Sequence, residues 1–227
     1  MSWTVKKEIT KEENNSDDIA NLKLALENAA KKKLIFCSAP DTGDISTDEL
    51  DAYFPIGSGV KDIFRIGAAK ADNSPWLQTG GRSIVDYILP GHQVRLRETD
   101  EEIKQKGHSF KTGSSVATAL AAGLAALMIH VVRMAAIRTY ELKREGVNEA
   151  NIIKLSSLAH AKSPTTMRKT FDSMKPNKEG ELYVHVWKNF KGKGNQLKVA
   201  GEEVSDEEAE AERWRIVSEL AGRFCRP

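Results

Sequence analysis

The chain has 227 residues, and 40% of them are hydrophobic, which is enough for one domain with a buried core. Its 34 basic and 32 acidic residues leave a net charge of +2. So small a charge excludes an overall positive electrostatic field that would attract nucleic acid or an anionic membrane. Two distant cysteines exclude a disulfide framework, and the first of them, Cys37, lies in an apolar run that predicts a buried thiol.

The first half of the chain alternates a helix with apolar strands. A hydroxyl and two acids at 16–18 are typical of a helix start, and the lysines at 31–33 are typical of a helix end. Three apolar runs then predict buried strands, the last closed by Pro90 and Gly91. These strands are 34–39, 62–70 and 83–89. The alternation predicts an α/β fold with a mostly parallel sheet flanked by helices.

The second half is mainly helical, beginning with a long apolar helix from Val116 to Tyr140. The unbroken apolar run within it covers only 119–129, short of the ~18 to 20 residues that a membrane span requires. We therefore expect a buried core helix and no membrane segment. The basic stretch 188–198 is expected to be a solvated loop, because acidic residues follow it at once. Further helices are predicted at 148–160, 165–173 and 205–224, a strand at 181–187 and a charged loop at 95–109.

Two serines stand at the mouth of the long helix, in the stretch TGSSVATALAAGLAALMIH from Thr112 to His130. The first turn of a helix has unpaired N–H groups and partial positive charge, so an oxyanion formed there is stabilised. Gly113 would let a substrate or the backbone approach closely. Serines also commonly cap helices, so these letters alone leave a capping role open.

The full string GSSVATALAAGLAAL resembles the nucleophile motif of the subtilases, the subtilisin-like serine peptidases of the S8 family. Ser115 falls at the nucleophile position, Ser114 replaces the usual threonine, and Ala119 stands where proline is common. Three upstream stretches resemble further subtilase motifs in family order: LIFCSAPDTG, FPIGSGVKDIFRIGAAK and SIVDYILPG. The spelling S-S-V-A-T-A is most similar to fungal subtilase-like domains.

This resemblance implies a partial subtilisin-like fold, with 1–140 as the carboxyl-terminal half of a peptidase domain and 141–227 as a helical and β extension. It implies peptide-bond hydrolysis through an acyl-enzyme on Ser115, whose own N–H is one oxyanion donor. The amino terminus resembles the strand that pairs with a peptide or protein substrate. The substrate-binding residues implied are Ser2, Trp3, Thr4, Gly113 and Ser114. No cofactor and no metal site are predicted.

The aspartate and histidine motifs of the family, D-[ST]-G and H-G-T, precede the matched region, and none of the five histidines lies in H-G-T. His92 and His108 are predicted to be surface or loop residues. We therefore expect the chain to be inactive by itself. An incomplete sheet would expose apolar surface, so another chain or domain is expected to cover it.

Asp41, Thr42 and Gly43 have the letters of the aspartate motif, but no histidine motif lies between them and Ser115. The resemblance places Asp41 at the position of the oxyanion-hole asparagine. An amide donates to a developing oxyanion, whereas an ionised carboxylate repels it, so Asp41 would serve only when protonated. The alternative is an exposed turn residue.

Two other functions remain open. The chain could be a non-catalytic subtilase remnant that binds other proteins, or an unrelated α/β domain in which Gly-Ser-Ser caps a helix. The amino terminus shows no apolar signal core, so a cytoplasmic location is the default expectation.

Overall fold

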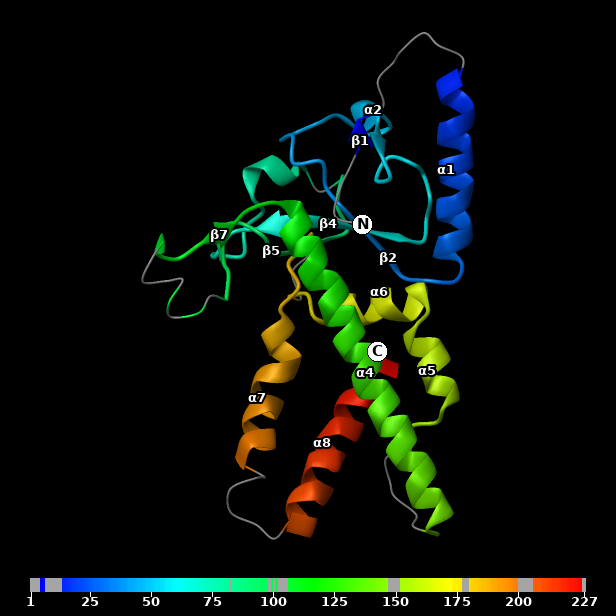
Figure 1. Ribbon diagram of the computed structural model, residues 1–227, viewed down its shortest axis with the longest axis vertical. Coiled ribbons are helices and arrows are strands. Elements are labelled where there is room, and N and C mark those ends of the chain that lie inside the picture. Colours follow the sequence, from blue (N-terminus) through cyan, green and yellow to red (C-terminus); the bar gives the residue numbers. More distant parts are fainter. Residues whose placement is uncertain are drawn as a thin grey trace. The chain divides into compact units, whose positions relative to one another are not determined.

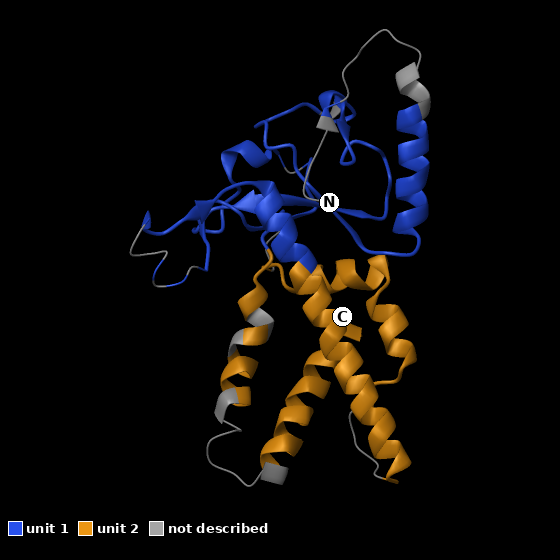
Figure 2. Cartoon of the chain, viewed as in Figure 1, with its two compact units in different colours: residues 1–122, 178–183 blue, residues 123–177, 184–227 orange. Residues whose placement is uncertain are grey.

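The computed structural model describes residues 5–6, 14–81, 83–97, 99, 101, 106–146, 152–176, 180–199 and 206–225. The chain forms two compact units, coloured separately in Figure 2. The first comprises Met1–Ala122 with Lys178–Tyr183, and the second comprises Gly123–Asn177 with Val184–Pro227. Each unit is described by itself.

A three-stranded parallel sheet forms the centre of the first unit (Figure 1). Its strands are β2 (Ile35–Ser38), β4 (Ile63–Ala69) and β5 (Tyr87–Pro90), in the order β2-β4-β5. All three predicted strands are present. The third begins at Tyr87 rather than at 83, because Ile84 turns back to donate its N–H to the Gly81 carbonyl.

Smaller elements surround this sheet. Helix α1 (Asn14–Ala30) is the helix that the sequence predicted. The unit also contains the short helix α2 (Thr47–Leu50) and the 3-10 turn η1 (Leu77–Thr79). Two antiparallel pairs complete the unit: β1 (Val5–Lys6) with β3 (Tyr53–Phe54), and β6 (Val94–Arg95) with β7 (Phe110–Lys111). The predicted α/β class, with a parallel sheet flanked by helices, is confirmed.

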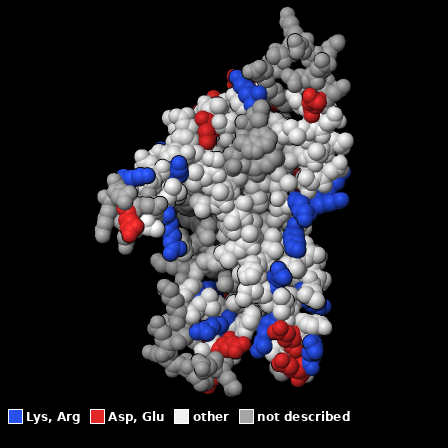
Figure 3. Space-filling model, viewed as in Figure 1, with Lys and Arg blue, Asp and Glu red and all other residues white. Residues whose placement is uncertain are grey.

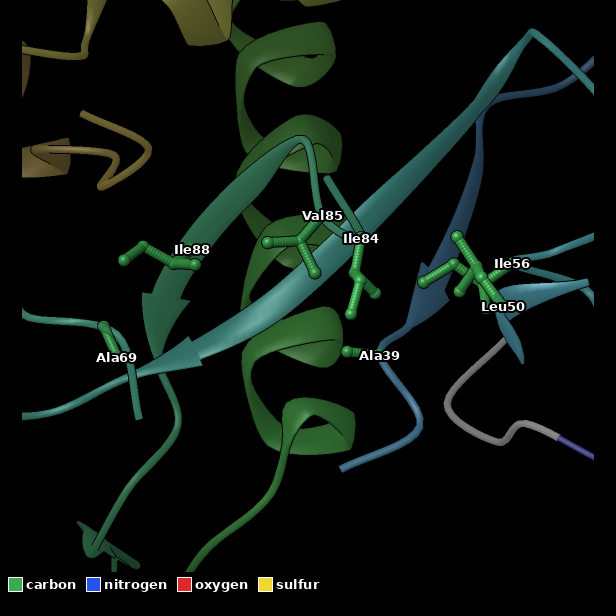
Figure 4. Packing of buried hydrophobic residues seen from close by; sticks show 7 residues of the cluster. All are labelled: Ala39, Leu50, Ile56, Ala69, Ile84, Val85 and Ile88. Atoms are coloured by element: carbon green, nitrogen blue, oxygen red, sulfur yellow. The ribbon is translucent and has the colours of Figure 1, made fainter. Parts of the chain in front are cut away.

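Two apolar clusters hold the first unit together. Figure 4 shows the larger one, which consists of Ala39, Leu50, Ile56, Ala69, Ile84, Val85 and Ile88. In the other, Leu26 of α1 packs on Cys37, Phe54 and Ile63. Burial raises the pKa of the Cys37 thiol to about 11, so this cysteine is inert and buried, as predicted.

Helix α4 (Ser114–Arg144) begins in the first unit and ends in the second. In its first-unit part, Ser114, Ala117 and Ala121 are fully buried, as expected of a core helix. By length and composition alone, α4 is also apolar enough to cross a membrane, but core helices of soluble proteins pass the same test.

The second unit is helical. With the remainder of α4 it contains α5 (Ser156–Ala161), α6 (Pro164–Ser173), α7 (Val186–Val199) and α8 (Asp206–Cys225). Ring contact between Phe190 and Phe224, at 5.6 Å, joins α7 to α8, and Lys193 pairs with Glu219 at 2.6 Å. Figure 3 shows basic and acidic side chains at scattered positions on the visible face.

Three sequence predictions in this region need correction. The strand predicted at 181–187 is only a single bridge, in which Tyr183 pairs with Ile88, and α7 begins at Val186. The alternation over seven residues was too short to outweigh the helical packing that follows. Stretch 188–198 is helical rather than a loop, although Gly192 and Gly194 weaken its helix propensity. The helix predicted at 148–160 begins only at Ser156 within the described residues.

Candidate active site

Ser114 attaches the start of α4 to the sheet. Its side chain is fully buried, and its Oγ accepts a hydrogen bond from the Ala68 N–H at 3.2 Å and lies 3.3 Å from Thr79 Oγ1. The Thr79 hydroxyl in turn donates to the Ala68 carbonyl at 3.2 Å and accepts from the Ala68 N–H at 2.9 Å. Ser114 is therefore a structural anchor, and its predicted contact with substrate stays a prediction.

Ser115 differs from Ser114 in that its hydroxyl and its N–H are not engaged by the rest of the described structure. The side chain is half-buried, and in the described part of the chain neither its hydroxyl nor its N–H has a hydrogen-bond partner outside the helix. The adjacent amides are all used: Ser114 donates to Asp41 Oδ2 at 2.7 Å, and Val116 and Ala117 donate to the Gly113 carbonyl at 3.0 and 3.5 Å. A hydroxyl and an unused donor therefore lie together at a helix start.

Asp41 reaches this helix start from the loop that follows β2, 73 positions before Ser114. Its φ of 55° is left-handed, a conformation that aspartate tolerates better than most residues. While Oδ2 accepts from Ser114, Oδ1 is buried and has no hydrogen-bond partner among the described residues. Burial raises the pKa of the Asp41 carboxyl, and the hydrogen bonds from Ser114 offset part of that rise.

Gly113 has no side chain, which leaves open the space beside the Ser115 hydroxyl and the Asp41 carboxyl. A Cβ at this position would lie 3.2 Å from Ser115 Oγ and 3.3 Å from Asp41 Oδ2, and the φ of 145° favours glycine. The Gly113 N–H donates to the Gly91 carbonyl at 2.7 Å, so the end of β5 positions the loop. The predicted residues Asp41, Gly113 and Ser115 are thus brought together.

The histidines lie elsewhere. His92 follows Gly91 and is half-buried, and its ring lies tilted against that of Trp76 with centroids 5.8 Å apart, while His108 is exposed. Within the residues that the structure describes, no hydrogen bond joins a histidine to Ser115, and no cluster of three or more His, Cys, Asp or Glu residues could hold a metal ion. The predicted substrate residues Ser2, Trp3 and Thr4 lie outside the described residues.

Comparison with known proteins supports the fold only. No family model and no curated protein matches the chain. A solved structure of a lanthipeptide protease is similar, with a TM-score of 0.50 and 16% sequence identity over 82% of this chain. The chain shares its fold with a protease. The match covers 56% of the lanthipeptide protease, so this chain spans little more than half of that protein's length.

Sequence reasoning missed the role of Thr79 and Ala68, which hold Ser114 in place. Thr79 lies 35 positions from Ser114, at the end of the 3-10 turn η1, and nothing in its local sequence predicts the contact. The contact is determined by tertiary structure alone, because it depends on how this turn folds back over β4.

Replacing Ser114 by alanine is expected to lower the free energy of unfolding by about 1–2 kcal/mol, because buried polar groups of Ala68 and Thr79 lose a partner. Ser115→Ala is the matched control, and a change within about 0.5 kcal/mol is expected because that hydroxyl has no partner to lose. Urea unfolding of both variants makes the comparison. Equal losses would contradict the different environments of the two serines.

Proposed function

We propose that this chain carries the nucleophile and oxyanion-binding part of a subtilisin-like serine peptidase site, of the S8 type, with Ser115 as the nucleophile. The observation that carries the proposal is the unpartnered hydroxyl and N–H of Ser115 at the start of a core helix. The protease fold of a solved neighbour and the four motifs in subtilase order support it.

In the proposed reaction Ser115 Oγ attacks the carbonyl carbon of a peptide bond, and its proton passes to a general base. The electrons of the carbonyl bond move to the oxygen, which accepts a hydrogen bond from the Ser115 N–H. Collapse of the tetrahedral intermediate breaks the C–N bond, and the base returns its proton to the leaving amine. Water then hydrolyses the acyl-enzyme by the same steps.

The general base is assigned to a polypeptide segment or chain other than the described residues, since no described histidine is hydrogen-bonded to Ser115. Leu120, near the start of α4, is an exposed apolar side chain. Exposed apolar surface favours contact with another chain. The partner that completes the site is therefore proposed to contact this part of α4.

Imidazole supplied in solution tests the proposal, because it can replace a missing histidine as general base. We expect 0.1–0.5 M imidazole, an order-of-magnitude range, to accelerate labelling of Ser115 by a fluorophosphonate by roughly 100-fold, the lower end of a general base's contribution. Mass spectrometry of the wild type and of Ser115→Ala measures the rate and the site. Labelling that imidazole does not accelerate, or that persists in Ser115→Ala, would overturn the proposal.

A second function is favoured by one observation, namely that among the described residues no hydrogen bond joins Ser115 to a histidine. In that case the chain is a non-catalytic module that retains the fold for binding another protein. Failure of imidazole to accelerate labelling of a folded sample is the result that this alternative requires.

A further inference from the structure

We propose that the second-unit part of helix α4 binds a second copy of this chain, as an antiparallel helix pair with its two-fold axis at Ile137. This inference goes beyond the proposed function, because it concerns an association surface and does not depend on the reactivity of Ser115.

Helix α4 continues through the second unit with one buried face and one exposed face (Figure 1). Val132 and Ala135 lie on the buried face and are fully buried. The exposed face carries Leu127, Ile137 and Tyr140, whose exposed fractions are 47%, 43% and 54%. Large apolar side chains exposed along one helix face indicate a surface that another molecule covers.

Two opposite charges lie on the exposed face, at equal distances on either side of Ile137. Arg133 comes four residues before it and Glu141 four residues after it, and both side chains are exposed. Residues four apart lie on the same side of a helix, about 6 Å from each other along the axis. Within the described residues no ion pair joins Arg133 or Glu141 to another side chain. Both charges are therefore available to a partner.

The order of these charges is complementary to itself. In an antiparallel pair with its two-fold axis at Ile137, each residue lies level with the residue at the same distance on the other side of Ile137 in the second copy. Arg133 of each copy is then level with Glu141 of the other, so two ion pairs form. In a parallel pair Arg133 would face its own copy, as would Glu141, and both contacts would repel. The charge order therefore selects the antiparallel arrangement.

The apolar residues agree with the same axis. Met134, three residues before Ile137, is half-buried, and Tyr140 stands three residues after it. The antiparallel pair places the Met134 thioether level with the Tyr140 ring of the other copy, and contacts between sulfur and an aromatic ring are favourable. Ile137 meets its own copy at the axis. Seven residues to either side, His130 lies level with Arg144, and this pairing adds no ion pair.

Other occupants fit the exposed face less well. A bilayer core would have to bury the charges of Arg133 and Glu141, and an anionic lipid surface would repel Glu141. An unrelated protein would have to supply an acid and a base in the matching order. A second copy of the chain already carries both at the required spacing.

A contact between two helices is a small interface. It lies at the low end of the areas that specific protein interfaces bury, so we expect a weak dimer with a dissociation constant on the order of 10–100 µM. Sedimentation velocity of the whole chain over a concentration series measures this constant.

Charge reversal tests the pairing. In a dimer of Arg133→Glu two carboxylates would face each other at both pairs, and in a dimer of Glu141→Arg two guanidinium groups would do so. We expect each variant to associate about tenfold more weakly than the wild type. Both positions are exposed and both replacements are good helix formers, so folding should be unchanged, which circular dichroism checks.

A one-to-one mixture of the two variants is the most specific sample. In the mixed dimer each pair again joins a carboxylate and a guanidinium, so association should return to within about threefold of the wild-type value. The double variant Arg133→Glu, Glu141→Arg should associate like the wild type for the same reason. Neither a loss of monomer stability nor binding to a different surface predicts recovery on mixing.

Oxidation of Ile137→Cys locates the axis. A cysteine at the two-fold position meets its own copy within reach of a disulfide, so the oxidised variant should form a covalent dimer that peptide mass spectrometry maps to position 137. His160→Cys is the matched control, because His160 is exposed on α5, outside the exposed face of α4. This control should form no disulfide at position 160.

Three results would overturn the inference. They are a wild type that stays monomeric up to about 1 mM, single variants that associate as strongly as the wild type, and a mixture that associates no better than the single variants. A monomeric wild type that floats with vesicles of phosphatidylcholine and phosphatidylserine would also overturn it and would identify lipid as the occupant. None of these measurements involves Ser115, so this inference and the proposed function fail separately.

Discussion

A fluorophosphonate probe without imidazole is expected to label Ser115 of the purified chain about 10⁶-fold more slowly than it labels a serine peptidase with an intact histidine. The hydroxyl keeps its proton at neutral pH, and no described histidine is hydrogen-bonded to it. The unused Ser115 N–H can stabilise the phosphonyl oxygen, but it cannot remove the hydroxyl proton. Intact-protein mass spectrometry over several hours measures the labelled fraction.

Fast labelling that disappears in Ser115→Ala would show that this expectation is wrong and that a histidine of the chain activates the serine. His92 and His108 are then the first candidates. His92 lies beside Gly91, which holds Gly113, whereas His108 is exposed before β7. Single alanine variants of the two would identify the base by loss of labelling.

Replacing Gly91 by alanine is expected to destabilise the fold by about 3 kcal/mol and to displace the serine loop. A Cβ there would lie 2.7 Å from the Ala68 Cβ and 2.9 Å from the Gly113 carbonyl oxygen, so the backbone of β4 or of the loop must move. The hydrogen bond from the Gly113 N–H to the Gly91 carbonyl would break. Urea unfolding and imidazole-assisted labelling should therefore both show losses.

Gly123→Ala is the matched control for this substitution. A Cβ at Gly123 meets nothing within 4 Å, and the position lies inside α4. Alanine is the better helix former, so a gain in stability of about 1 kcal/mol is expected. If Gly91→Ala were as stable as the wild type, the close approach of β5 to the serine loop would not be essential.

Much of the fold follows from local chemistry. Apolar runs at 34–39 and 62–70 and the long helix that includes Val116 could be predicted because buried parallel strands and core helices consist of continuous apolar residues. The buried Cys37 follows from the same pattern. A short alternation of apolar and polar residues was a less reliable signal. Stretch 181–187 was wrongly predicted as a strand because helix α7 begins at Val186 and is held by the packing of Phe190 on Phe224.

The sequence by itself also identified Ser115, Gly113 and Asp41 as candidate site residues. These residues match subtilase motifs that occur in the same order along the chain as in the family. Only the tertiary structure decided that the buried serine is Ser114, that Thr79 and Ala68 anchor it, and that one oxygen of Asp41 has no hydrogen-bond partner among the described residues. These facts depend on contacts between residues 35 or more positions apart. Local sequence determines which residues form helices and strands, whereas burial and hydrogen bonding across the sheet determine which of the two serine hydroxyls is held by the fold.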